Sequence, residues 1–255
     1  TLAEAVEAVT PENATVKILK NVALGARIAI SNKTVVFAAD APVTVSCATD
    51  RALDIRNNAD VTVEDCRMNT ACSAFRFGGR HVRIRRCTAA GPGEWPIRNS
   101  LSMDDRSAGR DCLGQGRRNM LSFFTYFADL SHGGVKADQG DILIEDCTVK
   151  NVDRFLHYNF SGNEVWQCGR PLRDVTFRRC TATGLGMSLC AYGAEKLPLA
   201  LKIEECSFSF ARPTSEFIRA AHLDSLKADR VTVDGVTGPF VRYWGERAPT
   251  VEASA

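Results

Sequence analysis

The side chains best suited to acid–base chemistry lie in the middle of the chain, at His132, Lys136, Asp138, Arg154 and His157. A histidine titrates near neutral pH, so His132 or His157 could act as a general acid or base. A β-elimination would instead require a lysine or an arginine to take up the proton, and Lys136 and Arg154 are the candidates. We predict these five residues as catalytic candidates.

A second group of side chains could hold a sugar. Trp166 lies close to Glu164 and Arg170. An indole ring can stack on a pyranose ring while polar neighbours fix its hydroxyl groups. Trp166 could equally anchor its own loop onto the rest of the fold. The predicted substrate-binding residues are Arg76, Asp104, Asp105, Asn159, Glu164, Trp166 and Arg170.

A repeated motif, apolar-x-apolar-x-x-Cys, indicates how these side chains are positioned. Each copy alternates apolar residues with mostly charged ones, as a strand with one buried face does. Two successive copies start at Val61 and Val82, and a spacing near 20 residues fits one coil of a solenoid with two or three short strands. The copies end at five cysteines, called here the ladder cysteines: Cys66, Cys87, Cys147, Cys180 and Cys206.

The ladder cysteines are half of the ten cysteines in the chain. Because they share one position in the repeat, we predict that they stack in the interior as small apolar groups. Cross-linking would not require a shared register, and no C-x-x-C segment suggests zinc. We therefore expect these five thiols to be free.

A second strand after several copies predicts a polar outer wall. If the residues nine and eleven positions after a ladder cysteine point inward, the residue between them points outward. A line of cationic and hydrogen-bonding groups suits a carboxylated or sulfated sugar chain, although outward strand residues are also often simply solvated. The predicted column comprises Arg76, His157, Cys190 and, on the last coil, Arg242, with Lys136 and Asp138 on the coil before His157.

Residues 1–255 are predicted to form one all-β domain, a single-stranded right-handed parallel β-helix. Residues 90–134 and 161–170 break the repeat and are predicted as inserted loops, which in a compact repeat are often functional. Within the first, Leu121–Phe127 is expected to be a strand or a short helix. An antiparallel sandwich or barrel is the alternative, ranked lower because hairpin signals such as Asn-Gly are absent.

The N-terminal residues 1–10 are predicted to form a capping helix that shields the open end of the solenoid. Leu2, Val6 and Val9 form one apolar stripe at helical spacing. Thr1 is the expected N-cap, and Glu4 completes the spacing of a capping box.

The bulk composition narrows the choice of partners. A formal net charge of +2 favours neither nucleic acid nor an acidic membrane surface, and no apolar run is long enough to cross a bilayer. We expect a polysaccharide as the partner of a monomer, with no nucleic acid, no membrane insertion, no metal site and no cofactor. Calcium is possible, because scattered aspartates could bind it.

The run Gly134–Val152 and the run Pro171–Gly184 resemble coils of the pectin-lyase-like right-handed parallel β-helix superfamily. The similarity covers roughly residues 134–236 and is closest to the polygalacturonase-type glycoside hydrolase family. Ser131-His132-Gly133-Gly134 is similar to that family's histidine motif. The resemblance implies a glycoside hydrolase or polysaccharide lyase that acts on an acidic polysaccharide outside the cell or at its surface. The alternative is a non-catalytic carbohydrate-binding or cell-surface solenoid.

Overall fold

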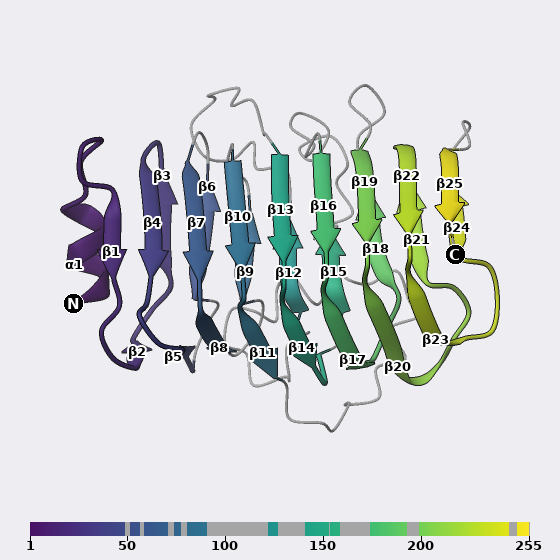
Figure 1. Cartoon of the computed structure of the whole chain (residues 1–255), viewed down its shortest axis with the longest axis horizontal. Coiled ribbons are helices and arrows are strands. Elements are labelled where there is room, and N and C mark those ends of the chain that lie inside the picture. The colour runs from purple at the N-terminus through teal and green to yellow at the C-terminus, as the bar shows by residue number, and fades with distance from the viewer. Residues whose placement is uncertain are drawn as a thin grey trace.

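Short strands with alternating apolar and polar residues wind into a parallel β-solenoid (Figure 1). The structure is a computed structural model. It describes residues 1–48, 52–56, 59–70, 74–77, 81–90, 122–126, 141–152, 154–158, 174–192, 199–244 and 249–254. Little of this is helical, because the repeat has a period of two along almost its whole length.

Successive strands along the chain belong in turn to three walls of the solenoid, so that each complete coil contributes one strand to each wall. The first wall is a nine-stranded sheet of β1 (Thr15–Lys17), β4 (Thr34–Ala38), β7 (Asp60–Glu64), β10 (His81–Arg85), β13 (Asp141–Glu145), β16 (Asp174–Arg178), β19 (Leu199–Glu204), β22 (Leu223–Asp229) and β25 (Thr250–Ser254). The second is an eight-stranded sheet of β2 (Val22–Leu24), β5 (Val43–Cys47), β8 (Cys66–Thr70), β11 (Thr88–Ala90), β14 (Thr148–Lys150), β17 (Thr181–Leu185), β20 (Ser207–Thr214) and β23 (Thr232–Val236).

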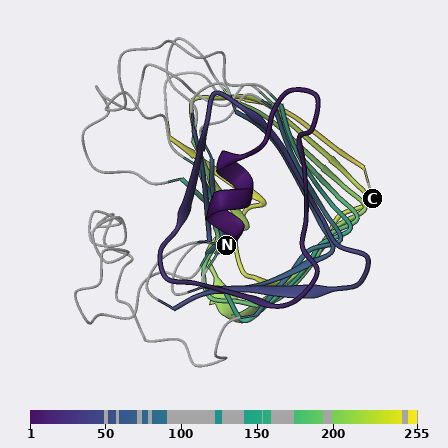
Figure 2. The same ribbon diagram turned by 90° about the vertical axis from the view of Figure 1, so that its left-hand side faces the viewer.

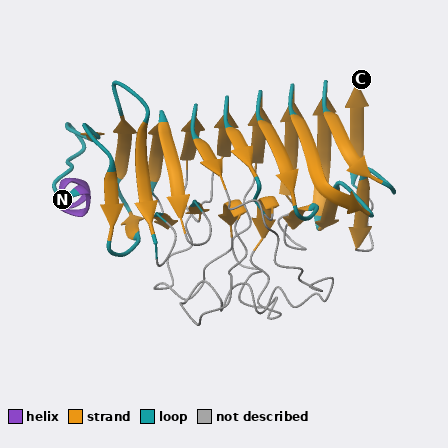
Figure 3. Ribbon diagram, turned by 90° about the horizontal axis from the view of Figure 1, so that it is seen from below, coloured by secondary structure: helices purple, strands orange, loops and turns teal. Residues whose placement is uncertain are grey.

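The third wall is divided into two sheets. One contains β3 (Ile28–Ser31), β6 (Leu53–Arg56), β9 (Phe75–Phe77), β12 (Ser122–Tyr126) and β15 (Arg154–Tyr158). The other contains β18 (Leu189–Tyr192), β21 (Ile218–Ala221) and β24 (Val241–Trp244), and β18 lies beside β15. In Figure 3 the strands of these walls lie across the long axis of the molecule.

The strand pairs are parallel throughout the described residues, as the repeat predicts. An antiparallel sandwich or barrel is thereby excluded for these strands. Equivalent repeat positions pair with one another: Val61 pairs with Val82, Val82 with Ile142, and the row continues through Val175 and Leu201.

These register rows build the core. The row of five apolar residues is buried throughout, and burial of each such side chain stabilises the fold by roughly 1.5–3 kcal/mol. Phe155 contacts Phe177 and Phe208 edge-on, with ring centroids 4.9 and 5.4 Å apart. The interior enclosed by the walls in Figure 2 is therefore filled by side chains.

The prediction for the ladder cysteines is confirmed, because all five are buried and free. Their thiols donate to main-chain carbonyls, as Cys180 Sγ does to Ile144 O at 3.4 Å and Arg178 O at 3.3 Å. A hydrogen bond to the neighbouring ladder thiol, followed by burial, raises the pKa of Cys87, Cys180 and Cys206. Protonated, buried thiols pack as apolar groups.

The helix predicted at the N-terminus is present but shorter, as α1 (Leu2–Glu7). Thr1 is its N-cap, and the capping box with Glu4 is formed. Val6 is fully buried, and Lys33 Nζ donates to Val6 O at 3.2 Å. In Figure 2 the helix lies within the outline of the coils at their N-terminal end.

The segment 90–134 is not wholly an inserted loop. It contains β12, which pairs with β9 on one side and β15 on the other. Of the two alternatives for Leu121–Phe127, the strand is correct. Strand β12 completes the coil begun by β10 and β11, so the regular fold continues through a region where the sequence motif is missing. The predicted loop at 161–170 lies outside the described residues.

Candidate functional site

The backbone register of the third wall aligns positions of the predicted column. Arg76 on β9 pairs with Thr125 on β12, and Thr125 pairs with His157 on β15. Phe75 and Leu156, the residues before Arg76 and His157, are buried in the core. For Arg76 and His157 the structure describes the backbone register, which places both positions in one row of the third wall. The position beside His157 belongs to Thr125, whereas Lys136 and Asp138 were predicted there.

The column continues on the three-stranded sheet, where Cys190, Arg219 and Arg242 pair in register. The inward neighbours Leu189 and Ile218 are buried. Arg242 is half exposed, as predicted for the last coil. Cys190 is only 2% exposed, so its place in the column does not make it a surface group.

A buried carboxylate, Glu216, lies directly beneath the two arginines. It precedes β21 and is fully inaccessible to solvent. Its Oε1 accepts a hydrogen bond from Arg219 Nε and lies 3.4 Å from Ser188 Oγ. Its Oε2 accepts a hydrogen bond from Ser215 Oγ and forms an ion pair with Arg242 Nε at 3.3 Å. We call these five residues the Glu216 cluster.

Hydrogen bonds also fix the backbone around Glu216. Ser188 Oγ donates to Glu216 O at 2.6 Å, and Thr214 Oγ1 donates to the same oxygen at 3.0 Å. Burial raises the pKa of the Glu216 carboxyl, but the hydrogen bonds from Ser215 and Arg219 and the charges of the two arginines outweigh it and leave the pKa lowered. Glu216 is therefore an ionised carboxylate held between two guanidinium groups.

Arg154, a predicted catalytic residue, lies next to this cluster at the start of β15. It is 2% exposed. Its Nη1 donates to Cys190 Sγ, and its Nη2 lies 3.6 Å from Met187 Sδ. Buried charged groups are costly and often mark functional sites. Arg154, Cys190 and the Glu216 cluster form one polar strip along the third wall of four consecutive coils.

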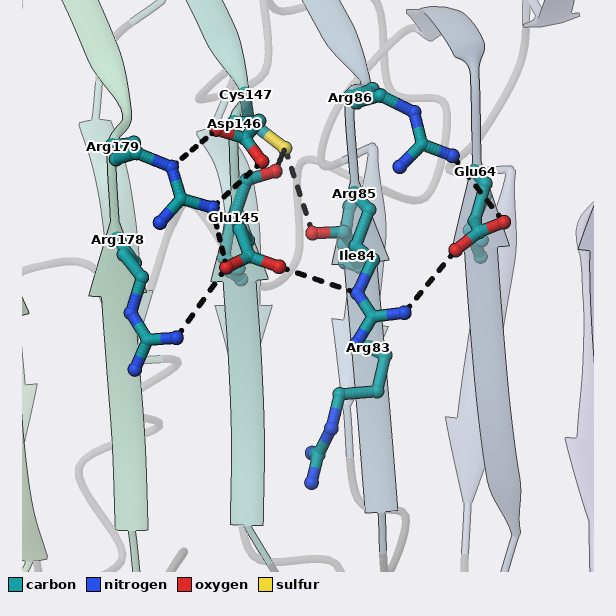
Figure 4. A network of polar contacts seen from close by, with 12 residues as sticks. Glu64, Arg83, Ile84, Arg85, Arg86, Glu145, Asp146, Cys147, Arg178 and Arg179 are labelled. Carbon is teal, nitrogen blue, oxygen red and sulfur yellow. Dashed lines mark hydrogen bonds and ion pairs between the residues drawn. The ribbon is translucent and has the colours of Figure 1, made fainter.

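A second network of charges lies at the corner that follows the first wall (Figure 4). The two residues before each ladder cysteine alternate in sign from coil to coil. They are acidic at 64 and 65, basic at 85 and 86, acidic at 145 and 146, basic at 178 and 179, and acidic at 204 and 205. We call these ten residues, with Asp229 and Arg230, the corner ladder.

The corner ladder is paired between neighbouring coils. Arg86 Nε donates to Asp65 Oδ1 at 2.8 Å, and Arg179 Nε donates to Asp146 Oδ1 at 2.7 Å. These hydrogen bonds lower the pKa of Asp65 and Asp146 and raise the pKa of Arg86 and Arg179. We call the two ladder residues of one coil a rung. Neighbouring rungs from Glu64 to Glu205 carry opposite charges and pair with each other, so this network is not our candidate site.

The corner ladder also occupies an unusual backbone conformation. The second residue of each rung has a left-handed φ between 49° and 57°, a region that L-residues with a Cβ rarely adopt. Its amide donates to a carbonyl on the next coil, as Arg179 N does to Glu204 O at 2.9 Å. The hydrogen bonds between successive corners therefore offset the strain of the left-handed backbone.

Of the predicted site residues, Arg154 is the one whose side chain the structure describes. For Arg76 and His157 only the backbone is described. The remaining predicted residues lie outside the described residues: His132, Lys136, Asp138, Asp104, Asp105, Asn159, Glu164, Trp166 and Arg170.

Sequence reasoning missed Glu216, Ser188 and Arg219. A usable signal was present in Ser215-Glu216-Phe217-Ile218-Arg219. Phe217 and Ile218 are both buried, so the acid stands directly before two core residues. Arg219 also lies 13 residues after Cys206, whereas Arg76, His157 and Cys190 each lie ten residues after their ladder cysteine. The difference arises because β20 is longer than its equivalents and carries a register shift.

Three further observations bear on chemistry. Among the described residues, no group of three His, Cys, Asp or Glu side chains could hold a metal ion. None of the helices in the described part of the chain is long and apolar enough to span a membrane. The sequence matches no protein-family model, and no curated protein or solved structure matches it either.

Proposed function

We propose that this solenoid binds an acidic polysaccharide along the outer face of its third wall, with Arg242 as an anion-contacting group. The observation that carries this proposal is the pair of in-register arginines, Arg219 and Arg242, which share one buried carboxylate. One carboxylate contacts two guanidinium groups at this point of the wall. Arg242 is 49% exposed and can reach a ligand.

Guanidinium groups suit this task because their planar donors match the oxygens of carboxylates and sulfate esters. A row of equivalent positions on parallel coils presents such groups at a regular spacing of roughly 4.8 Å. The register of Arg76, Thr125 and His157 forms a row on the same wall along β9, β12 and β15. A long, repetitive ligand would fit a long, repetitive wall.

Binding has better support than cleavage at the Glu216 cluster. Both carboxylate oxygens of Glu216 are occupied by donors, and its lowered pKa keeps it ionised. A general acid would need a raised pKa and access to the ligand. Hydrolase or lyase activity remains a prediction from sequence that depends on His157, Arg154, His132, Lys136 and Asp138.

The proposal includes the finer features of the fold. A right-handed coil of the pectin-lyase-like type, with α1 acting as a cap, would leave the third wall as an open binding face. Contacts of α1 support the cap, since Val6 is buried and Lys33 holds its carbonyl. We also propose a monomer outside the cell or at its surface, where such polymers occur.

The experiment is calorimetric titration with polygalacturonate, a sulfated glycan and a neutral glucan. We expect binding to one or both acidic polymers and not to the glucan. Arg242→Gln should weaken that binding by about tenfold or more, because a charge-assisted hydrogen bond contributes about 1.5–3 kcal/mol. Product analysis of the same mixtures tests cleavage.

The matched control is Arg212→Gln, which removes an exposed arginine from β20 on another wall. It should bind as the wild type does. No binding to either acidic polymer, or an equal loss in both variants, would contradict the proposal.

A further inference from the structure

Glu216 is buried in a way that fits a positioning role. Its carboxylate has no exposed surface, and its hydrogen-bond and ion-pair partners come from three consecutive coils: Ser188, Ser215 and Arg219, and Arg242. An ionised carboxylate can accept several hydrogen bonds, and here both oxygens are engaged. The group is thus unavailable to a ligand, and its contacts act on the side chains around it.

The two arginines need this carboxylate because they are direct neighbours. Arg219 and Arg242 pair in register on adjacent parallel strands, whose backbones lie about 4.7–4.9 Å apart. Like charges in directly opposed positions repel each other and destabilise a sheet. Glu216 contacts the Nε atom of both guanidinium groups and so offsets that repulsion from below.

The point of contact on Arg242 decides which atoms face outward. Among the described residues, Glu216 is its one ion-pair partner, and the contact is made through Nε. The Nη1 and Nη2 atoms lie at the far end of the planar group. Holding Nε therefore limits the rotation of a long side chain while its outer donors remain available.

From this geometry we infer that Glu216 is the positioning residue of an anion subsite in which Arg242 contacts the ligand and Arg219 supports it. The ligand is a single anionic group, either a carboxylate or a sulfate, on the polysaccharide of the proposed function. Immobilising a flexible side chain in advance reduces the ordering cost of binding by about 0.5–1.5 kcal/mol. This inference rests on the proposed function and goes on to assign the residue that prepares the site.

The test compares Glu216→Gln, which keeps the shape of the side chain but removes its charge, with Glu205→Gln. Glu205 pairs with Arg230 at 2.9 Å in the exposed corner ladder and is the matched control. Glu216→Gln should weaken binding of the acidic polymer by about two- to tenfold, and Glu205→Gln should leave it unchanged.

A spectroscopic readout separates positioning from general stability. The side-chain Nε–H of Arg242, assigned by its loss in Arg242→Gln, should give a sharp ¹H–¹⁵N signal in the wild type. Addition of inorganic sulfate should shift that signal in the wild type, and the signal should broaden in Glu216→Gln. If Glu216→Gln does not fold, Ser215→Ala provides the same test, since it removes only one donor to the carboxylate.

The outcomes distinguish the two proposals. If Arg242→Gln loses binding while Glu216→Gln and Ser215→Ala bind as the wild type does, the positioning role is overturned and the proposed function stands. If the wild type binds no acidic polymer but sulfate shifts the Arg242 signal only when Glu216 is present, the function fails and the anion subsite stands. A signal that is unchanged in Glu216→Gln refutes the inference directly.

Discussion

The corner ladder and the Glu216 cluster use the same two kinds of charge in opposite ways. In the corner ladder, acidic and basic rungs alternate along the coils, and side chains such as Arg179 remain substantially exposed. In the Glu216 cluster, one acid with no exposed surface serves two arginines on neighbouring strands. The first arrangement repeats along the surface, whereas the second gathers two arginines around one buried acid.

This difference indicates what each network does. Exposed ion pairs contribute only about 0.2–1 kcal/mol each, but an alternating series of them penalises any shift of one coil against the next. A buried carboxylate gains little stability over an apolar core and is costly if its partners are removed. The corner ladder therefore specifies the order of the coils, and the Glu216 cluster is the part of the wall that packing alone does not explain.

The largest effect is expected from Glu216→Ala. It would leave two adjacent guanidinium groups without their shared carboxylate, and loss of one partner from a buried charge network costs about 3–5 kcal/mol. Urea denaturation gives the free energy of unfolding. The control Glu205→Ala removes a half-exposed corner carboxylate and should cost no more than about 1 kcal/mol. Equal losses in the two variants would erase the distinction between the networks.

The next effect comes from reversing one rung of the corner ladder. The double substitution Arg178→Glu and Arg179→Glu would place an acidic rung between Glu145 and Asp146 on one side and Glu204 on the other. Several favourable pairs would become repulsive, each change being worth a few tenths of a kcal/mol or more, so we expect a loss of about 2–3 kcal/mol. Because salt screens exposed charges, about 1 M NaCl should recover much of this loss but little of that in Glu216→Ala.

An acid titration should produce a smaller effect that also distinguishes the networks. The pKa of Glu216 is lowered from its ordinary value of 4.5, and those of Asp65 and Asp146 from 3.8. A lowered pKa in the folded state contributes stability above the unfolded pKa, and this stability is lost as the pH falls through the folded value. The wild type should thus be more stable than Glu216→Gln at neutral pH, and the gap should narrow below about pH 4.5.

Chemical denaturation of the wild type and Glu216→Gln across this range measures the gap. The aspartates of the corner ladder titrate in both proteins and cancel in the difference. A gap that stays constant down to about pH 3, or that widens, would show that the Glu216 charge contributes nothing to folding.

The fold could be predicted from the sequence because each copy of the repeat marks both a strand and the face of that strand that is buried. The apolar-x-apolar-x-x-Cys motif identified the strands and the inward rows, and pairs such as Val82 with Ile142 confirm the register. The sequence left open whether Ser122–Tyr126 forms a strand or a short helix, because these residues lack the motif. They form β12 because β9 and β15 on either side supply its pairing partners.

The candidate site was predictable only in part. Arg242 and the register of Arg76 with His157 follow from counting along a strand of period two. Glu216 does not, because it precedes its strand at a corner where both following residues turn inward. Its burial depends on Ser188, Arg219 and Arg242, which come from three coils, and no spacing within one coil reveals such a contact.

The smallest effect is expected at the left-handed corner itself. Glu205 has φ 54°, and its replacement by Asn should change the free energy of unfolding by no more than about 0.5 kcal/mol. Asparagine tolerates this conformation better than glutamate, which offsets the loss of the contact with Arg230, and Arg230 keeps its 2.9 Å ion pair with Asp229. Glu205→Val removes the same charge but adds a β-branched side chain, so it should cost more than about 1 kcal/mol. If both variants lose the same stability, the corner depends on its charge rather than on its backbone, and the corner ladder then resembles the Glu216 cluster more closely than its exposure suggests.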